Sequence, residues 1–198
     1  MMQDSRFRIY EPCIMNLESF TVNYDLSTIS MTLEKLNNFS TRDAITLFRQ
    51  CCGCVKWANE METRRPFSNL EHLYAVADEV WNTLTIEDWK EAFTHHPKIG
   101  DVNELREKFP STAHMAEGEQ SGVAHTSEKI LKALSEGNQL YEAKFGYIFI
   151  VCATGKSAEE MLTLLNARLN NIPSEEITIA AGEQAKITKI RLKRLLND

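Results

Sequence analysis

The hydrophobic residues of this chain recur every three or four positions over most of its length, with polar residues between them. This spacing places apolar side chains on one face of an α-helix, and each such face needs a partner to bury it. The pattern therefore predicts an all-α fold, a single-domain compact bundle of several helices. The stripes are Ala44, Leu47, Phe48 and Cys51; Leu70, Leu73, Ala77, Val80 and Trp81; Ile86, Trp89 and Phe93; Ile130, Leu131, Leu134, Tyr141 and Phe145; Met161, Leu164 and Leu165; and Ile177, Ala180, Ala181, Gln184, Ile187 and Arg191.

Residues that favour helix starts stand ahead of several stripes. A Ser or Thr followed three positions later by an acidic residue fits the spacing of a capping box. The pairs are Ser40 with Asp43, Ser68 with Glu71, Thr85 with Asp88, and Ser157 with Glu160. We also expect helices from about Met31, between Ser127 and Gly146, from Ala158 to about Leu169, and from Glu175 to the end.

One short apolar segment, residues 147–153, breaks the helical rhythm. It is rich in β-branched and aromatic residues and lies between Gly146 and Gly155, which predicts an extended strand without a second strand to pair with. Its unpaired amides and carbonyls could bind a ligand rich in such groups. Periodicity alone equally allows the most buried helix of the bundle.

The composition is that of an ordinary globular chain with one sizeable core, since 43% of its 198 residues are hydrophobic and 25% are charged. Residues 1–30 lack a clear period, so we expect a peripheral N-terminal extension followed by a helical domain at 31–198. A net charge of -6 argues against nucleic acid as a partner. The absence of a long apolar run and of a leader argues against a membrane and favours a cytoplasmic protein.

The cysteines and histidines predict neither disulfides nor a metal site. Five cysteines, an odd number, suit reduced thiols. Cys51 and Cys54 have the spacing of a redox pair, but no strand precedes them, so buried, unreactive thiols are the favoured interpretation. No pair of histidines has the spacing typical of zinc ligands, and we expect no metal.

Two adjacent histidines follow the stripe that ends at Phe93. His96 comes three residues later and continues the buried face, whereas His95 points to another side. Pro97 disfavours helical geometry at His96 and lacks an amide hydrogen, so the chain turns a stiff corner there. His96 could therefore be a general acid, or a histidine that interacts with the last carbonyls of the helix.

A second polar constellation lies at residues 117–122, where Glu119 and Gln120 stand between Gly118 and Gly122. The glycines allow a ligand to approach the backbone, and a carboxylate beside a carboxamide could bind a cyclic amide. By itself this signal is weak.

The runs that carry a family resemblance are Arg65-Pro66-Phe67; Ala92-Phe93, His96-Pro97 and Ile99-Gly100; Gly118-Glu119-Gln120; Lys144-Phe145-Gly146; Phe149 to Ala153 with Gly155-Lys156; and Lys186 to Leu192. Together these motifs are far more specific than any one of them. With them, roughly residues 31 to 197 resemble the 2-oxo-4-hydroxy-4-carboxy-5-ureidoimidazoline (OHCU) decarboxylase family of purine catabolism. The resemblance implies an all-helical domain, usually a homodimer, that converts this small-molecule ureidoimidazoline to (S)-allantoin and CO2 without cofactor or metal.

The resemblance also implies the site. Its catalytic residues fall on His96, Glu119 and Arg191. Many members have a serine where this chain has Ala116, so water or backbone would replace that hydroxyl, which we expect to alter binding rather than activity. The implied substrate contacts are Pro97, Ala116, Glu117, Gly118, Glu119, Gln120, Phe149, Ile150, Val151, Cys152 and Ala153.

These residue types suit the reaction. His96 would deliver the proton that sets the stereocentre after CO2 has left. Glu119 would accept ring or ureido N–H groups. A grip of Arg191 on the departing carboxylate would stabilise the ground state, so we expect it to act on Glu119, on a carbonyl or in initial capture. The rival hypotheses are a non-catalytic helical module that binds a purine-derived metabolite or a partner protein, and a redox protein that uses its C-x-x-C pair.

Overall fold

The computed structural model describes residues 31–96 and 121–196, and the side chains of 121–127 lie outside this description. Within these ranges the chain forms eight helices and no β-strand. The predicted all-α fold is therefore confirmed. The helices are α1 (Leu33–Asn38), α2 (Thr41–Cys52), α3 (Val55–Thr63), α4 (Leu70–Asn82), α5 (Ile86–Thr94), α8 (Ser121–Phe145), α9 (Ala158–Arg168) and α10 (Pro173–Leu195).

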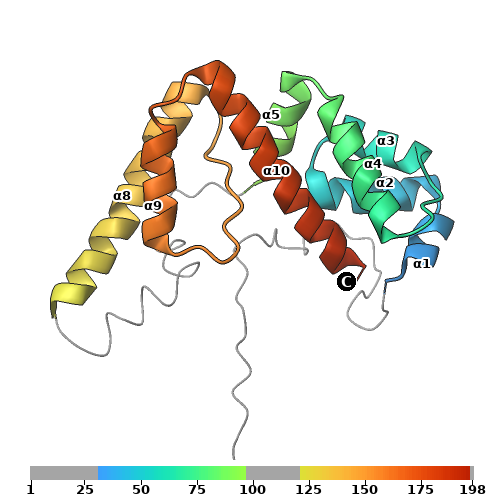
Figure 1. Cartoon of the computed structure of the whole chain (residues 1–198), viewed down its shortest axis with the longest axis horizontal. Coiled ribbons are helices and arrows are strands. Elements are labelled where there is room, and N and C mark those ends of the chain that lie inside the picture. The colour runs from blue at the N-terminus through green and yellow to red at the C-terminus, as the bar shows by residue number, and fades with distance from the viewer. Residues whose placement is uncertain (1–30, 97–120, 197–198) are drawn as a thin grey trace, which may run out of the picture.

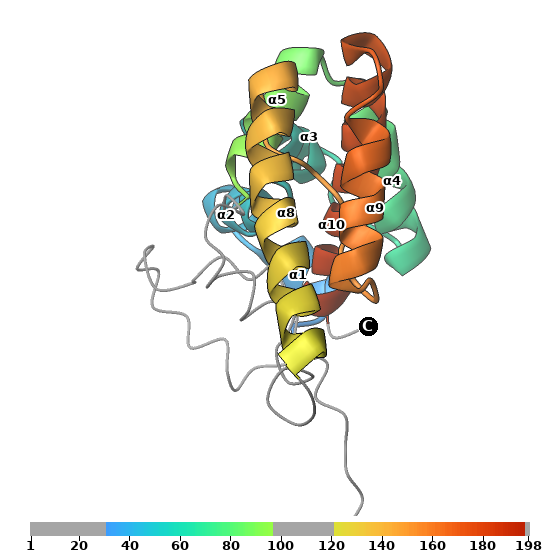
Figure 2. The same cartoon turned by 90° about the vertical axis from the view of Figure 1, so that its left-hand side faces the viewer.

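The long helix α10 lies between two groups of helices (Figure 1). On one side it packs against α2, α4 and α5, which belong to the N-terminal group. On the other side α8 and α9 form a pair that lies side by side in both views (Figure 2). Because α10 contacts the group that ends with α5 and follows directly after α9, it joins the two halves of the core. None of the described helices is long and apolar enough to span a bilayer.

Helix starts follow the predicted signals with one exception. Thr85 and Ser157 head complete capping boxes, and the side chain of Ser40 caps α2. Ser68 was predicted to cap α4, but this is wrong, since the side chain of Asn69 accepts from the backbone of His72 and the helix starts one residue later. Asparagine is as good an N-cap as serine, so the two neighbouring signals could not be ranked from sequence.

Helix α3 has no counterpart among the predicted elements. Gly53 ends α2 with a φ of 89° in the left-handed region, and the Cys54 sulfur caps α3 by accepting from the Trp57 amide at 3.4 Å. Trp57 and Met61, both residues of this helix, are fully buried. Cysteine is not a typical N-cap residue, which is why the start was missed.

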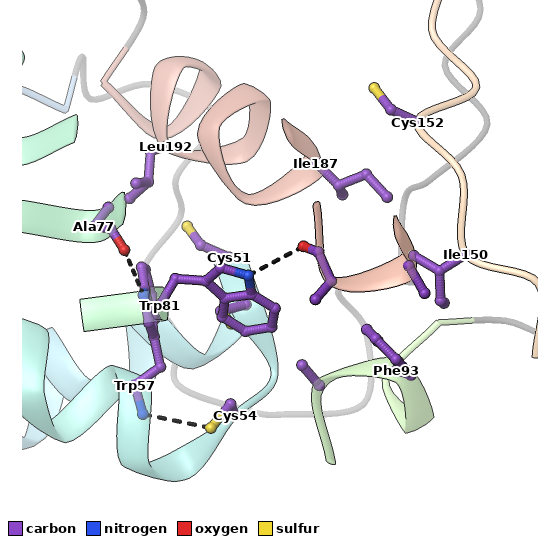
Figure 3. Packing of buried hydrophobic residues seen from close by; sticks show 14 of the residues in the cluster. Cys51, Cys54, Trp57, Ala77, Trp81, Phe93, Ile150, Cys152, Ile187 and Leu192 are labelled. Carbon is purple, nitrogen blue, oxygen red and sulfur yellow. Dashed lines mark hydrogen bonds between the residues drawn. The ribbon is translucent and has the colours of Figure 1, made fainter. Parts of the chain in front are cut away.

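Tryptophans of the central core link α4 to its neighbours (Figure 3). The indole nitrogen of Trp81 donates to the Ala181 carbonyl of α10 at 3.0 Å, and that of Trp57 donates to the Ala77 carbonyl at 3.2 Å. Both rings are buried, so their N–H groups need these partners. The Trp81 bond holds α10 in register with α4, and the Trp57 bond ties α3 to α4.

Candidate active site

His96 lies just beyond the end of α5 and faces α10. His95 is the C-cap residue of α5, and the His96 amide still donates to the Phe93 carbonyl at 3.2 Å. The half-buried His96 ring places Nε2 2.5 Å from Oε1 of Gln184, a fully buried residue of α10. The ring is therefore held by a neighbouring helix, and the C-cap position belongs to His95.

His95 is also half-buried, but against a different neighbour. Its side chain packs on Gly53 so closely that a Cβ at Gly53 would lie 2.8 Å from the His95 Cβ. The sequence predicted that only one histidine of the pair could face inward. In the structure each is half-buried, His96 on α10 and His95 on the turn between α2 and α3, because the chain leaves helical geometry between them.

Arg191 is half-buried two turns beyond Gln184 on α10. Its Nη1 donates to the Cys51 carbonyl at 3.1 Å, in the last turn of α2, where helix carbonyls lack helical partners. Its Nη2 is buried, and no described residue bonds to it. Residues seven apart lie on one face of a helix, about 10 Å apart along its axis. The face of α10 that holds His96 therefore also presents a guanidinium nitrogen without a partner among the described residues.

The apolar segment 148–153 runs between α8 and α9 and is neither a helix nor a paired strand. The expectation that its backbone lacks protein partners needs correction. Ile150 and Cys152 accept from Arg168 and Lys156 through their carbonyls at 2.7 Å and 2.6 Å, and the Cys152 amide donates to Glu183 at 2.7 Å. These side chains replace the missing second strand. Among the described residues, no partner is found for the amides of Ile150 and Val151.

A buried polar cluster contacts this segment through Arg168. Arg168 Nε donates to Oε1 of Glu176 at 2.7 Å, and its guanidinium carbon lies 4.6 Å from the centre of the Phe149 ring. The hydroxyl of Tyr141 donates to the same carboxylate, and burial raises the pKa of Tyr141 far above its usual range. Glu176 is fully buried. Because each charge has an opposite partner, the cluster fixes the segment without leaving an unpaired charge in the core.

Cys51, Cys52 and Cys54 lie near the site, where they are buried and form no disulfide. Burial raises the pKa of Cys51 and Cys52 to about 12 and that of Cys54 to about 11. Thiols in this state are poor nucleophiles at neutral pH. This agrees with the interpretation of Cys51 and Cys54 as structural residues and weakens the redox hypothesis.

Other predicted site residues lie outside the described ranges. These include every predicted substrate contact before α8, so the position of Glu119 relative to His96 and Arg191 stays a prediction. The expected absence of a metal stays a prediction as well, since His114 and the side chain of His125 are outside the description. The predicted site residues outside the described ranges are Pro97, Ala116, Glu117, Gly118, Glu119 and Gln120.

Comparison with known proteins decides the family. Residues 37–193, well over half of the chain, match the family model for OHCU decarboxylase. The chain belongs to the OHCU decarboxylase family. This confirms the resemblance inferred from its motifs.

Two curated relatives are similar to this chain. It is 38% identical over 151 residues to the uric acid degradation bifunctional protein TTL of Arabidopsis thaliana, an alignment that covers 76% of this chain and 47% of that protein. It is 25% identical over 167 residues to the 2-oxo-4-hydroxy-4-carboxy-5-ureidoimidazoline decarboxylase of Amia calva, which covers 84% of this chain and 95% of that protein. The chain thus spans about half the length of the Arabidopsis protein.

Solved structures agree with this assignment. A crystal structure of OHCU decarboxylase in the presence of (S)-allantoin matches with a TM-score of 0.60 and 38% identity, over 76% of this chain and 97% of that one. A crystal structure of (S)-allantoin synthase matches with a TM-score of 0.62 and 15% identity, over 84% of this chain and 54% of that one. At that identity the second likeness shows the fold alone.

Proposed function

We propose that the protein is a carboxy-lyase of urate degradation that converts OHCU to (S)-allantoin and CO2, with His96 as the proton donor. The observation that carries the proposal is the His96 ring, held by a buried glutamine on the face of α10 that also carries Arg191. This arrangement occurs within the span that matches OHCU decarboxylase. The reaction requires a proton donor on one face of the substrate, and an imidazole fixed in this way suits that task.

The chemistry needs few groups. Breaking the bond to the carboxylate releases CO2 and leaves an electron pair on the ring carbon, delocalised into the adjacent ring system. His96 then transfers a proton to that carbon, and a single stereocentre results if only one face of the ring is within reach. Imidazole suits this role because its unperturbed pKa lies close to neutral pH.

Substrate binding is assigned to three groups of residues. Arg191 Nη2 would take a carbonyl or help to capture the substrate, since a stronger grip on the departing carboxylate would stabilise the ground state. The amides of Ile150 and Val151 would donate to substrate carbonyls. Glu119 would accept substrate N–H groups. Such bonds are stronger in buried surroundings, because little water is present there to compete for the same donors and acceptors.

Assembly and location complete the proposal. We propose a homodimer that works without a cofactor, as the family resemblance implies, and we propose the cytoplasm as its location. Sedimentation of the purified protein at several concentrations would test the dimer, and a monomer at all of them would contradict it.

Circular dichroism of the product tests the activity. Urate oxidase and hydroxyisourate hydrolase would generate OHCU from urate in the cuvette, with and without the protein. We expect the protein to cause rapid growth of the optical signal of (S)-allantoin, because uncatalysed decay is not stereoselective. A non-catalytic binding module would leave the time course unchanged, and this result would overturn the proposal.

A further inference from the structure

We propose that Glu91 is a positioning residue of the reaction, because it binds the end of α5, and with it His96, to the same junction that holds Arg191. The inference rests on the proposed decarboxylase function and adds to it a residue outside the substrate contacts. We call residues 51–56, which end α2 and begin α3, the α2–α3 junction.

One row of side chains on α5 and its C-cap lies along the α2–α3 junction. The three members of this row are spaced three and four residues apart, so they share one face of the helix. In the central contact the Val55 amide donates to Oε2 of Glu91 at 3.2 Å. The row follows the junction in order, from residue 56 back to residue 53. The pairs are Asp88 with Lys56, Glu91 with Val55, and His95 with Gly53.

The Glu91 contact is stronger than its neighbour in this row. Val55 is the first residue of α3, and its amide is one of the four that have no partner within the helix. The half-buried Glu91 side chain supplies that partner, and its negative charge suits the positive end of the helix dipole. The ammonium of Lys56 is half-exposed, so its ion pair with Asp88 contributes less.

The same junction holds the second proposed catalytic side chain. Arg191 of α10 donates from Nη1 to the Cys51 carbonyl at 3.1 Å. The helices carrying the two side chains, α5 and α10, also pack against each other. A movement of the end of α5 on the junction would therefore change the position of His96 relative to Arg191. A misplacement of about 1 Å between reacting groups can lower a rate by about 100-fold.

Loss of the Glu91 bond should lower kcat and leave KM almost unchanged. Glu91→Ala keeps the bond between Arg191 and Cys51, so substrate capture should be preserved and KM should stay within about twofold. We expect kcat to fall by about 10-fold, because the proton donor is less well placed. Glu91→Gln keeps an acceptor for the Val55 amide and should retain most of kcat. Exposed Glu87 of the same helix provides the control Glu87→Ala, which should leave kcat and KM unchanged.

Val55→Pro removes the donor of the same bond and leaves the Glu91 carboxylate in place. Proline is favoured at the first position of a helix, and Cys54 before it has the extended conformation that proline requires, with φ of -75° and ψ of 124°. α3 should therefore form as before, and kcat should fall as in Glu91→Ala. The double variant Glu91→Ala/Val55→Pro should lose no more than either single variant, because all three lack the same bond.

Histidine NMR gives a measurement that does not depend on activity. In the full chain labelled with 13C-histidine, the ring signals of His95 and His96 are assigned by their loss in His95→Ala and His96→Ala. Both should shift in Glu91→Ala and in Val55→Pro, and neither should shift in Glu87→Ala. A residue that only stabilised the fold would leave the signals of the folded molecules in place.

Three results would overturn the proposal: a folded Glu91→Ala protein with unchanged kcat, an equal loss of kcat in Glu87→Ala, or losses that multiply in the double variant. If Glu91→Ala does not fold, Val55→Pro decides by the same criteria. If the histidine signals shift as expected but the wild-type protein makes no (S)-allantoin, the proposed function fails while the positioning of α5 by Glu91 stands.

Discussion

Arg168 of α9 donates from Nη1 to the Ile150 carbonyl at 2.7 Å while its Nε is bonded to the buried carboxylate of Glu176. One guanidinium thus ties the apolar segment 148–153 to the two C-terminal helices. A charge so deep in the core is costly unless it is paired, and its net contribution to stability is often small. We infer that the pair is kept for what it orders, namely the backbone that we assign to substrate binding.

The first prediction separates stability from this ordering. Arg168→Met should lower the free energy of unfolding by about 3 to 5 kcal/mol, because it leaves the Glu176 carboxylate buried without a cation. The double variant Arg168→Met/Glu176→Gln should recover part of the stability but not the activity, since Ile150 still lacks its donor. Urea unfolding and decarboxylation rates measure the two effects.

The exposed pair of Arg64 and Glu79, 3.0 Å apart, is the matched control. Arg64→Met should cost less than about 1 kcal/mol because solvent screens this pair, and it should leave the rate unchanged. Full recovery of activity in the double variant would contradict the role that we assign to Arg168.

Helical spacing was enough to predict most of the fold, whereas contacts between distant helices were not predictable. The stripe from Ile177 to Arg191 predicted the inward face of α10, including Gln184. A polar residue in a buried stripe signals a hydrogen-bond partner, but the sequence did not identify His96 as that partner. Arg168 and Glu176 carried no signal, since charged residues are usually exposed on helices and their burial depends on tertiary packing.

The extended segment illustrates the same limit. Its composition correctly marked a break between helices, but a lone apolar run does not reveal which side chains will satisfy its backbone. Lys156, just after the segment, donates to the Cys152 carbonyl, and Glu183 of α10 accepts from the Cys152 amide. Neither hydrogen bond could be predicted from spacing along the chain. The motifs nevertheless identified the family, because they constrain many positions at once.

The second prediction concerns the two histidines. His96→Ala should reduce stereoselective formation of (S)-allantoin by at least about 100-fold, as for the loss of a general acid. His95→Ala should retain most of the rate, because His95 packs on Gly53 rather than on α10. Initial rates by circular dichroism measure both variants. Equal losses would count against His96 as the proton donor.

The third prediction concerns the support beneath His95. Gly53→Ala should destabilise the protein by about 2 to 4 kcal/mol, since it combines a strained φ of 89° with a Cβ 2.8 Å from the His95 Cβ. The displaced end of α5 should also lower kcat. Gly146→Ala is the control for strain alone, because Gly146 has a φ of 77° and nothing within 4 Å of an added Cβ. A smaller loss of stability in Gly53→Ala than in Gly146→Ala would exclude the clash.

The fourth prediction concerns the thiols. Burial raises the pKa of Cys51 and Cys52 to about 12, so both thiols are almost entirely protonated at pH 8. Iodoacetamide should therefore leave both unmodified in the folded protein and modify them in urea, as measured by peptide mass spectrometry. Activity should survive the native treatment. Rapid native modification with loss of activity would revive the redox hypothesis.

The last prediction uses Glu183, which joins α10 to the apolar segment. Its carboxylate accepts from the Cys152 amide at 2.7 Å and from the Lys186 ammonium at 2.5 Å. Burial opposes the charged form, but these two bonds outweigh it and lower the pKa of Glu183 below its ordinary value. The bonded carboxylate therefore stabilises the fold above pH 4.5, and this contribution is lost as the pH falls below that value through the lowered pKa.

Glu183→Gln keeps the size of the side chain and removes its charge. It should cost about 1 to 2 kcal/mol at pH 7, because the amide oxygen is a weaker acceptor for the Cys152 N–H and no longer attracts Lys186. The difference from wild type should shrink as the pH is lowered towards 3, where the wild-type carboxyl is also neutral. Urea titrations at pH 7, 5, 4 and 3 measure it, with Lys186→Met separating the ammonium from the amide. A difference that stays constant over this range would mean that the charge of Glu183 does not anchor Cys152.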